Sequence, residues 1–234
     1  MFVLLLVYFG ADRPPSRHFH RLIVPWLLWS AIYSTLKVVQ ALSERRPVGS
    51  EFELWMLSTG PAIHLWFLPF AFLVLVAFSA VPKVSPGVLW AVAGAASVAS
   101  LAVAQWTLPI PLTQYSTVLP AALAGLVMAQ TKALIAPPLA LAALAVALNL
   151  AGLEVATYQT AIAGAAVALA FLLQLPSTNL TRRLAAISFG VYLVHPAVIA
   201  ALEANVGEGI FPILVMVLSM MVVSVLLRVS PRFV

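Results

Sequence analysis

The sequence predicts an all-α protein, a polytopic bundle of transmembrane helices. Of its 234 residues, 63% are hydrophobic and 8% are charged, and the mean hydropathy is +1.09. Soluble domains are nearer half apolar and a quarter charged. Apolar stretches also recur along the whole chain, and no polar stretch is long enough to fold as a separate soluble domain. We therefore expect a single membrane-embedded domain over residues 1–234.

The apolar stretches predict about eight full transmembrane helices and one partial helix, because a span needs about 20 residues. Residues 1–9 are apolar but too few to span, so they form the partial helix. The full spans are expected near residues 22–42, 62–81, 87–104, 117–130, 133–150, 157–175, 184–202 and 210–227. Most prolines fall at or near these ends, where a break in the helix is tolerated. The segment near 117–130 is the shortest.

The charges give the bundle an orientation. With residues 10–21 placed in the cytoplasm and the sides alternated from there, basic residues collect on the cytoplasmic side. They are Arg13, Arg17, Arg21, Lys83, Lys132, Arg182, Arg183, Arg228 and Arg232. The outer loops hold only Arg45 and Arg46 together with nearly all the acids. This is the positive-inside pattern, so we attribute the net charge of +5 to membrane orientation and expect no nucleic-acid partner.

The stretch RHFHR, Arg17 to Arg21, is a basic cluster at the start of the second apolar segment. One interpretation is an orientation signal that contacts lipid phosphates. The other is a binding patch for an anionic cytoplasmic cofactor, because guanidinium groups pair with phosphate oxygens.

A second polar cluster, HLWFLP, begins with His64 near the outer end of its segment. His64 and Trp66 either belong to the aromatic belt of the membrane interface or line a pocket for an acceptor on the outer face. Lys37, in the preceding segment, either extends to the outer interface or shares an inward face with Tyr33 and Gln40.

The stretch GVYLVHP places a histidine near the middle of the segment 184–202. Ser188, Tyr192 and His195 are spaced by four and three, so they share one helix face. Pro196 has no N–H to donate to the Tyr192 carbonyl, so we expect a kink and an oxygen without its usual partner. The stripe either clamps the bundle by interhelical hydrogen bonds or supplies proton transfer and acceptor positioning at a cavity.

Other chemistry is not indicated. The chain has no cysteine, which excludes disulfides and thiolate metal sites. HExxH, GxSxG, CxxC and phosphate-binding glycine loops are also missing. We therefore expect no metal site and no permanently bound cofactor.

Three stretches resemble the integral-membrane acyltransferase family 3, the O-acetylases of bacterial surface sugars. They are RHFHRLIVPWLLWSAIY, HLWFLPF and ISFGVYLVHPAVI, in the family's order and separation. The resemblance implies a multi-pass protein of the bacterial inner membrane that uses acyl-CoA, usually acetyl-CoA, as co-substrate. The acyl group would pass to a hydroxyl of an extracytoplasmic glycan or lipid-linked sugar. Acceptor identity, acyl chain and oligomeric state stay open.

The resemblance also suggests roles for individual residues. Arg17 and Arg21 would contact the CoA. His64, Trp66, Ser188 and Tyr192 would line the acceptor site or its path, and His195 would support catalysis.

The family's usual first helix, with an Arg and a catalytic His about ten residues later, has no counterpart in the sequence. We therefore expect an N-terminally truncated member, with Phe2 to Phe9 as the remnant of the second helix. Whether this chain is active stays open, as does a non-enzymatic role as a transporter or scaffold for a lipid-linked saccharide.

Overall fold

The computed structural model describes residues 2–104, 108–152, 158–174, 178–202 and 211–229, and these contain helices and turns but no strand. The principal helices are α1 (Phe2–Gly10), α3 (Val24–Ser43), α5 (Phe67–Ser79), α6 (Pro86–Ala104), α7 (Leu112–Thr131), α8 (Ala136–Leu150), α9 (Tyr158–Leu172), α10 (Asn179–Leu202) and α11 (Phe211–Val229). Short segments connect them: α2 (Pro15–His18), η1 (Phe19–Ile23), η2 (Val48–Glu51), α4 (Met56–Thr59) and η3 (Ile63–Trp66). The predicted all-α class is confirmed.

Each of the eight predicted spans corresponds to one helix, from α3 and from α5 to α11. Four helical stretches are long and apolar enough to cross a membrane: Pro15–Ser43, Pro86–Val103, Leu112–Thr131 and Phe211–Arg228. Four more are apolar but shorter: His64–Ser79, Ala136–Leu150, Thr160–Leu172 and Ile187–Leu202. The chain is therefore an integral membrane helical bundle.

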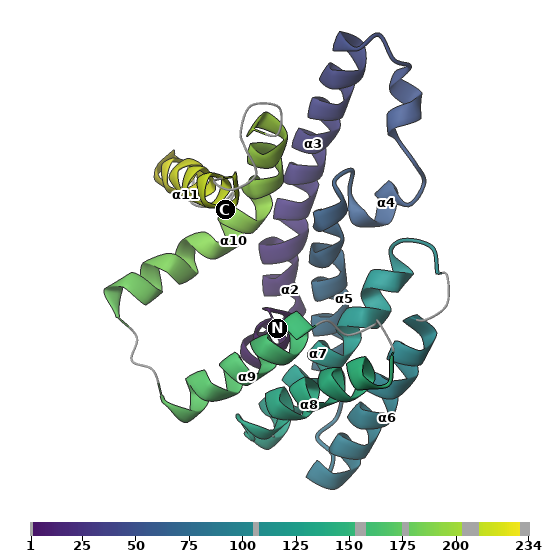
Figure 1. Cartoon of the computed structure of the whole chain (residues 1–234), viewed down its shortest axis with the longest axis vertical. Helices are drawn as coiled ribbons and strands as arrows, with labels where there is room; N and C mark the ends of the chain where they lie inside the picture. Colours follow the sequence, from purple (N-terminus) through teal and green to yellow (C-terminus); the bar gives the residue numbers. More distant parts are fainter. Residues whose placement is uncertain (1, 105–107, 153–157, 175–177, 203–210, 230–234) are drawn as a thin grey trace.

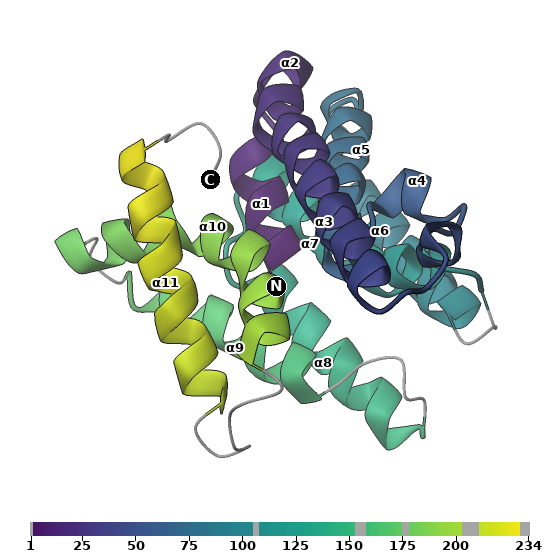
Figure 2. The same cartoon turned by 90° about the horizontal axis from the view of Figure 1, so that it is seen from above.

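The helices pack mainly as pairs. α6 lies against α7, α8 against α9, α10 against α11, and α1 against α7. Figures 1 and 2 show the α10–α11 pair on one side of α3 and the α5 and α6 helices on the other. A site shared by α10 and η3 therefore lies beside α3.

The second apolar segment begins earlier than predicted. Helical structure runs from Pro15 through a π-helical turn, η1, into α3 without a break. Pro25, in the first turn of α3, has no N–H to donate to the carbonyl four residues before it. The π-helical turn, which is wider than an α-helical turn, directly precedes this position. The basic cluster consequently lies on helical turns, not in a loop.

The seventh helix also differs from the predicted segment 117–130, because α7 already begins at Leu112. The polar residues in its first turns are accommodated in the helix. Ser116 and Thr117 donate their hydroxyls to carbonyls three residues earlier, as such side chains do in membrane helices. The helix therefore begins five residues before the predicted segment.

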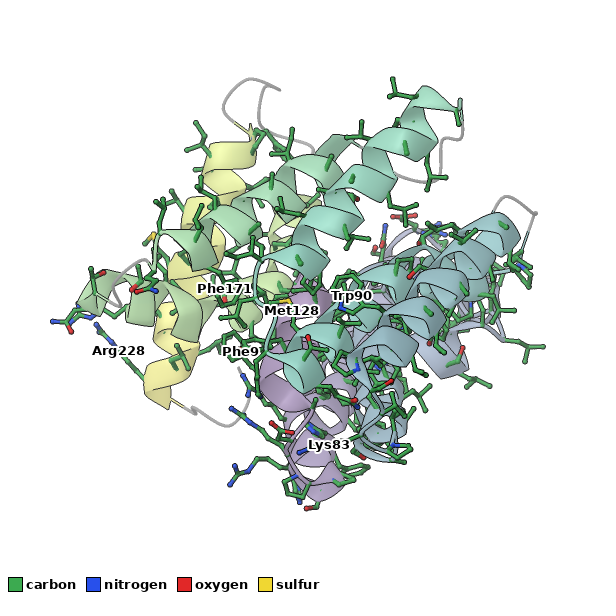
Figure 3. All side chains as sticks on the ribbon, turned by 90° about the horizontal axis from the view of Figure 1, so that it is seen from below. Phe9, Lys83, Trp90, Met128, Phe171 and Arg228 are labelled. Carbon is green, nitrogen blue, oxygen red and sulfur yellow. The ribbon has the colours of Figure 1, made fainter. Side chains whose placement is uncertain are left out.

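The core lies where α1, α5, α7 and α10 meet. Leu4, Leu68, Met128 and Leu193 are completely buried there, and Figure 3 shows Met128 near the centre of the view, while Arg228 lies at its edge. α1 approaches α7 so closely at Gly125 that an added Cβ would overlap the Leu4 carbonyl oxygen. Small residues permit such backbone contact in membrane proteins.

The loop after α3 carries a small ionic cluster. Arg46 pairs with Glu44 and Glu51, and Lys37 Nζ lies 3.5 Å from the Glu51 carbonyl oxygen. Lys37 therefore extends toward this loop, in agreement with the first of its two interpretations. Hydrogen bonds from the Gln40 amide and from Arg46 lower the pKa of Glu44 below its ordinary 4.5.

Candidate functional site

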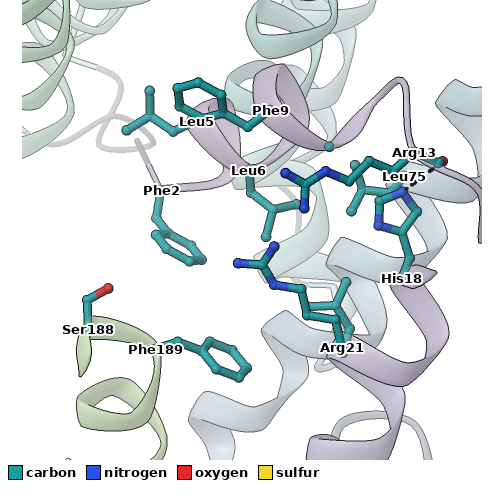
Figure 4. Close-up of a pocket in the computed structure, with 12 residues that line it drawn as sticks. Phe2, Leu5, Leu6, Phe9, Arg13, His18, Arg21, Leu75, Ser188 and Phe189 are labelled. Atoms are coloured by element: carbon teal, nitrogen blue, oxygen red, sulfur yellow. Dashed lines mark hydrogen bonds between the residues drawn. The ribbon is translucent and has the colours of Figure 1, made fainter. Parts of the chain in front are cut away.

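A pocket of about 400 Å³ opens between α1, the basic turns and α10. We call it the basic pocket. Its cationic and polar lining consists of Arg13, His18, Arg21 and Ser188, and its apolar lining of Phe2, Leu5, Leu6, Phe9, Leu22, Leu75 and Phe189, together with Gly10. Figure 4 shows both guanidinium groups directed into the space between the phenyl rings. The pocket therefore combines a cationic side with apolar walls.

His18 fixes the geometry of the cationic side. Its ring is buried, and Nε2 lies 3.2 Å from the carbonyl oxygen of Arg13. A carbonyl only accepts, so the ring N–H donates and ties the turn after α1 to α2. Among the described residues, neither Arg13 nor Arg21 has a carboxylate partner. Two guanidinium groups that have no carboxylate partner in the described part of the chain, beside apolar walls, suit an anionic ligand with an apolar portion.

An open groove of about 730 Å³ adjoins this pocket and is lined by Arg17, His20 and Arg21 with Pro14, Ser16 and Val24. Arg21 lines both spaces, so the groove and the basic pocket are neighbours. The two arginines predicted to act together do line one surface. Arg13 and His18 line the basic pocket, and His20 lines the groove.

A second group of polar rings, here named the histidine cluster, comprises Tyr33, His64, Tyr192 and His195. The His64 ring centroid is 5.2 Å from that of Tyr33 and 5.7 Å from those of Tyr192 and His195. The members come from α3, η3 and α10, three elements far apart in sequence. Three of the four were predicted to contribute to a site or its path.

Hydrogen bonds hold the histidine cluster to the backbone. The Tyr33 hydroxyl donates to the Leu193 carbonyl at 2.8 Å, and the Tyr192 hydroxyl donates to the carbonyl of His64. His195 Nδ1 lies 2.8 Å from the Tyr192 carbonyl oxygen. The buried Nε2 of His64 makes no hydrogen bond with the described residues. This leaves an imidazole nitrogen that can form a hydrogen bond with a hydroxyl group or a water.

The remaining two predicted residues lie outside this cluster. Trp66 packs against Phe70 and Tyr115, with ring centroids 5.8 and 5.9 Å away. Ser188 lines the basic pocket. Because Ser188 and His195 are seven residues apart on α10, about 10 Å at 1.5 Å per residue, this helix connects the basic pocket to the histidine cluster.

The comparison with protein families decides the assignment. A family profile described as an acyltransferase domain, Acyl_transf_3, matches residues 16–229. The chain belongs to acyltransferase family 3. No curated protein and no solved structure matches it significantly. As a family member with several apolar helices, it is an acyltransferase-type integral membrane protein.

For this acyltransferase family member, the sequence placed His18 in the basic cluster and Tyr33 on a face that could point inward, but it assigned no site role to Arg13, His18 or Tyr33 individually. Arg13, Arg17 and Arg21 recur every fourth residue, which would have been a usable signal. His18 looked like part of a surface cluster, yet it is buried. Tyr33 contacts a segment 160 residues away, and no local pattern predicts such a contact.

Proposed function

We propose that the chain transfers an acyl group, acetyl in the simplest case, from cytoplasmic acyl-CoA to a hydroxyl of an extracytoplasmic glycan or lipid-linked sugar. The proposal places it in the inner membrane of a bacterium. The observation that carries it is the pairing of two sites along α10. The basic pocket contains guanidinium groups and apolar walls, and the histidine cluster contains imidazoles about 10 Å further along the helix.

The basic pocket suits the donor. Phosphates of CoA would pair with Arg13, Arg17 and Arg21, because guanidinium groups form charge-assisted hydrogen bonds with phosphate oxygens. The apolar walls from α1 and from Phe189 would accept the less polar arm that carries the thioester. The predicted orientation puts this end of the bundle in the cytoplasm, where acyl-CoA is found.

The histidine cluster suits the acceptor. In the transfer step, the sugar hydroxyl oxygen attacks the thioester carbonyl carbon, a new C–O bond forms, and the C–S bond breaks. The hydroxyl proton passes to a base, and the CoA thiolate leaves and is protonated by solvent. A neutral imidazole with a free nitrogen is the usual base near neutral pH. We assign the supporting role of this base to His195. His64 and Tyr192 lie beside it, and Trp66 would line the acceptor path.

The test uses membranes that contain the full chain, acetyl-CoA labelled in the acetyl group, and extracted glycan and lipid-linked saccharide. Arg17→Ala with Arg21→Ala should lower acyl-CoA binding and transfer together. Arg45→Ala is the matched control, because Arg45 is exposed in the outer loop and lines neither site. We expect this control to be unaffected.

Two results would oppose the proposal. If the double variant binds acyl-CoA as well as the unaltered protein does, the basic pocket is not the donor site. Saccharide export that persists while no acyl-CoA binds would instead favour the transporter or scaffold role.

A further inference from the structure

Pro196 lies inside α10, directly after His195. In an α-helix the N–H of residue 196 would donate to the carbonyl of Tyr192, and proline has no N–H. The Tyr192 oxygen therefore lacks its helical partner. Figure 1 shows that α10 bends along its length, as a helix with an internal proline is expected to do.

The structure shows what takes the place of the missing donor. His195 Nδ1 is 2.8 Å from the Tyr192 carbonyl oxygen and 3.2 Å from that of Val191. The Val191 oxygen is the normal helical acceptor for the backbone N–H of His195, so the shorter contact is to the oxygen that the proline leaves unpaired. The imidazole thus completes the hydrogen bonding of its own helix.

This contact determines which ring nitrogen carries the proton. A carbonyl oxygen only accepts hydrogen bonds, so a neutral His195 must be protonated at Nδ1. Nε2 then carries the lone pair, and the ring as a whole lies beside His64, with centroids 5.7 Å apart. A partner on one imidazole nitrogen fixes the tautomer and ring orientation for the other.

We propose that Pro196 is a positioning residue: by leaving the Tyr192 carbonyl unpaired, it holds His195 with Nδ1 protonated and Nε2 free to accept a proton. The effect of Pro196 on acyl transfer rests on the proposed function, whereas its effect on the His195 tautomer does not. With any other residue at 196, a backbone N–H would compete for the same oxygen. His195 would then lose the contact that orients its ring.

The test is ¹⁵N NMR of the histidine rings of the full chain in lipid nanodiscs. His195→Gln identifies the His195 signals by their loss, which is practical because the chain has four histidines. In the unaltered protein we expect a proton on Nδ1 and none on Nε2. In Pro196→Ala we expect the Nε2-protonated tautomer or exchange between the two forms, with transfer reduced about tenfold or more.

Pro120→Ala is the matched control. Pro120 also lies inside a helix, α7, where it likewise leaves a carbonyl without its helical donor. The residue directly before it is Leu119 and not a histidine, so this substitution should leave the His195 tautomer unchanged. A change of the same size in this control would overturn the inference, because the response would then not be specific to residue 196.

Other outcomes separate the inference from the proposed function. An unprotonated Nδ1 in the unaltered protein would overturn it, and this reading holds even if Pro196→Ala does not fold. A changed tautomer with unchanged transfer would overturn the positioning role. If the unaltered protein transfers no acyl group, the proposed function fails. The tautomer of His195 is then still decided by the NMR spectrum alone.

Discussion

The contact between α1 and α7 at Gly125 predicts a large effect from a single methyl group. A Cβ at position 125 would overlap the carbonyl oxygen of Leu4 and lie 2.9 Å from the Cβ of Val7. The carbonyl belongs to a helix backbone and cannot rotate away as a side chain would. Gly125→Ala must therefore push α1 off α7 or bend one of the two helices.

The expected cost combines two opposing effects. Overpacking in a tight contact costs about 1–3 kcal/mol, and a backbone obstacle places this case toward the upper end. Alanine is the better helix former and returns about 0.5–1 kcal/mol. Gly94→Ala in α6 is the matched control, because nothing lies within 4 Å of its added Cβ. It should keep only the gain, so the two variants should differ by about 1–3 kcal/mol.

The assay is thermal unfolding of both variants in the same detergent, followed by tryptophan fluorescence. For a chain of this length, 1 kcal/mol corresponds to about 2–4 °C in Tm. Gly125→Ala should thus unfold about 2–12 °C below Gly94→Ala. It should also weaken acyl-CoA binding, because α1 supplies Phe2 and Phe9 to the basic pocket. Equal Tm values for the two variants would refute the reasoning.

Three further predictions follow from single contacts. Tyr33→Phe removes the hydrogen bond to the Leu193 carbonyl and should cost about 0.5–1.5 kcal/mol in chemical unfolding; no loss would mean that the contact does not stabilise the α3–α10 junction. Arg21→Ala should weaken acyl-CoA binding in a filter assay about 10- to 100-fold, unlike a change at a cation outside the pocket. Hydrogen bonds from the Gln40 amide and from Arg46 lower the pKa of Glu44. These contacts therefore stabilise the folded protein above pH 4.5, and the stabilisation is lost as the pH falls through the lowered pKa. An NMR titration of this carboxyl group with a midpoint at or above pH 4.5 would contradict this.

The sequence predicted the helices better than their packing. Apolar length located the segments, and Pro25 and Pro86 lie near the start of their helices as expected. Hydropathy does not distinguish a lipid-facing side chain from one buried in the bundle: Val39 is 58% exposed, while Leu4 is fully buried. The pairing of α1 with α7 therefore could not be predicted from apolar pattern.

Features of the candidate site that lie within one helix were predictable from the sequence, and features that depend on contacts between distant segments were not. The spacing of Ser188, Tyr192 and His195 correctly placed them along one helix, which connects the basic pocket to the histidine cluster. The sequence did not indicate that Ser188 would lie in the basic pocket or that Trp66 would pack apart from His64. Those outcomes depend on how α10 and η3 meet α3, and this is set by tertiary contacts far apart in sequence.

The central claim is that the acyl group passes from the basic pocket at one face of the membrane to an acceptor near the histidine cluster. It is tested most directly in inverted membrane vesicles, with labelled acetyl-CoA added only outside, at the face of Arg17 and Arg21. The account predicts label on glycan or lipid-linked sugar inside the vesicles, and little label with the Arg21→Ala variant. Label that reaches only acceptors on the outside, or that does not depend on Arg21, would contradict it.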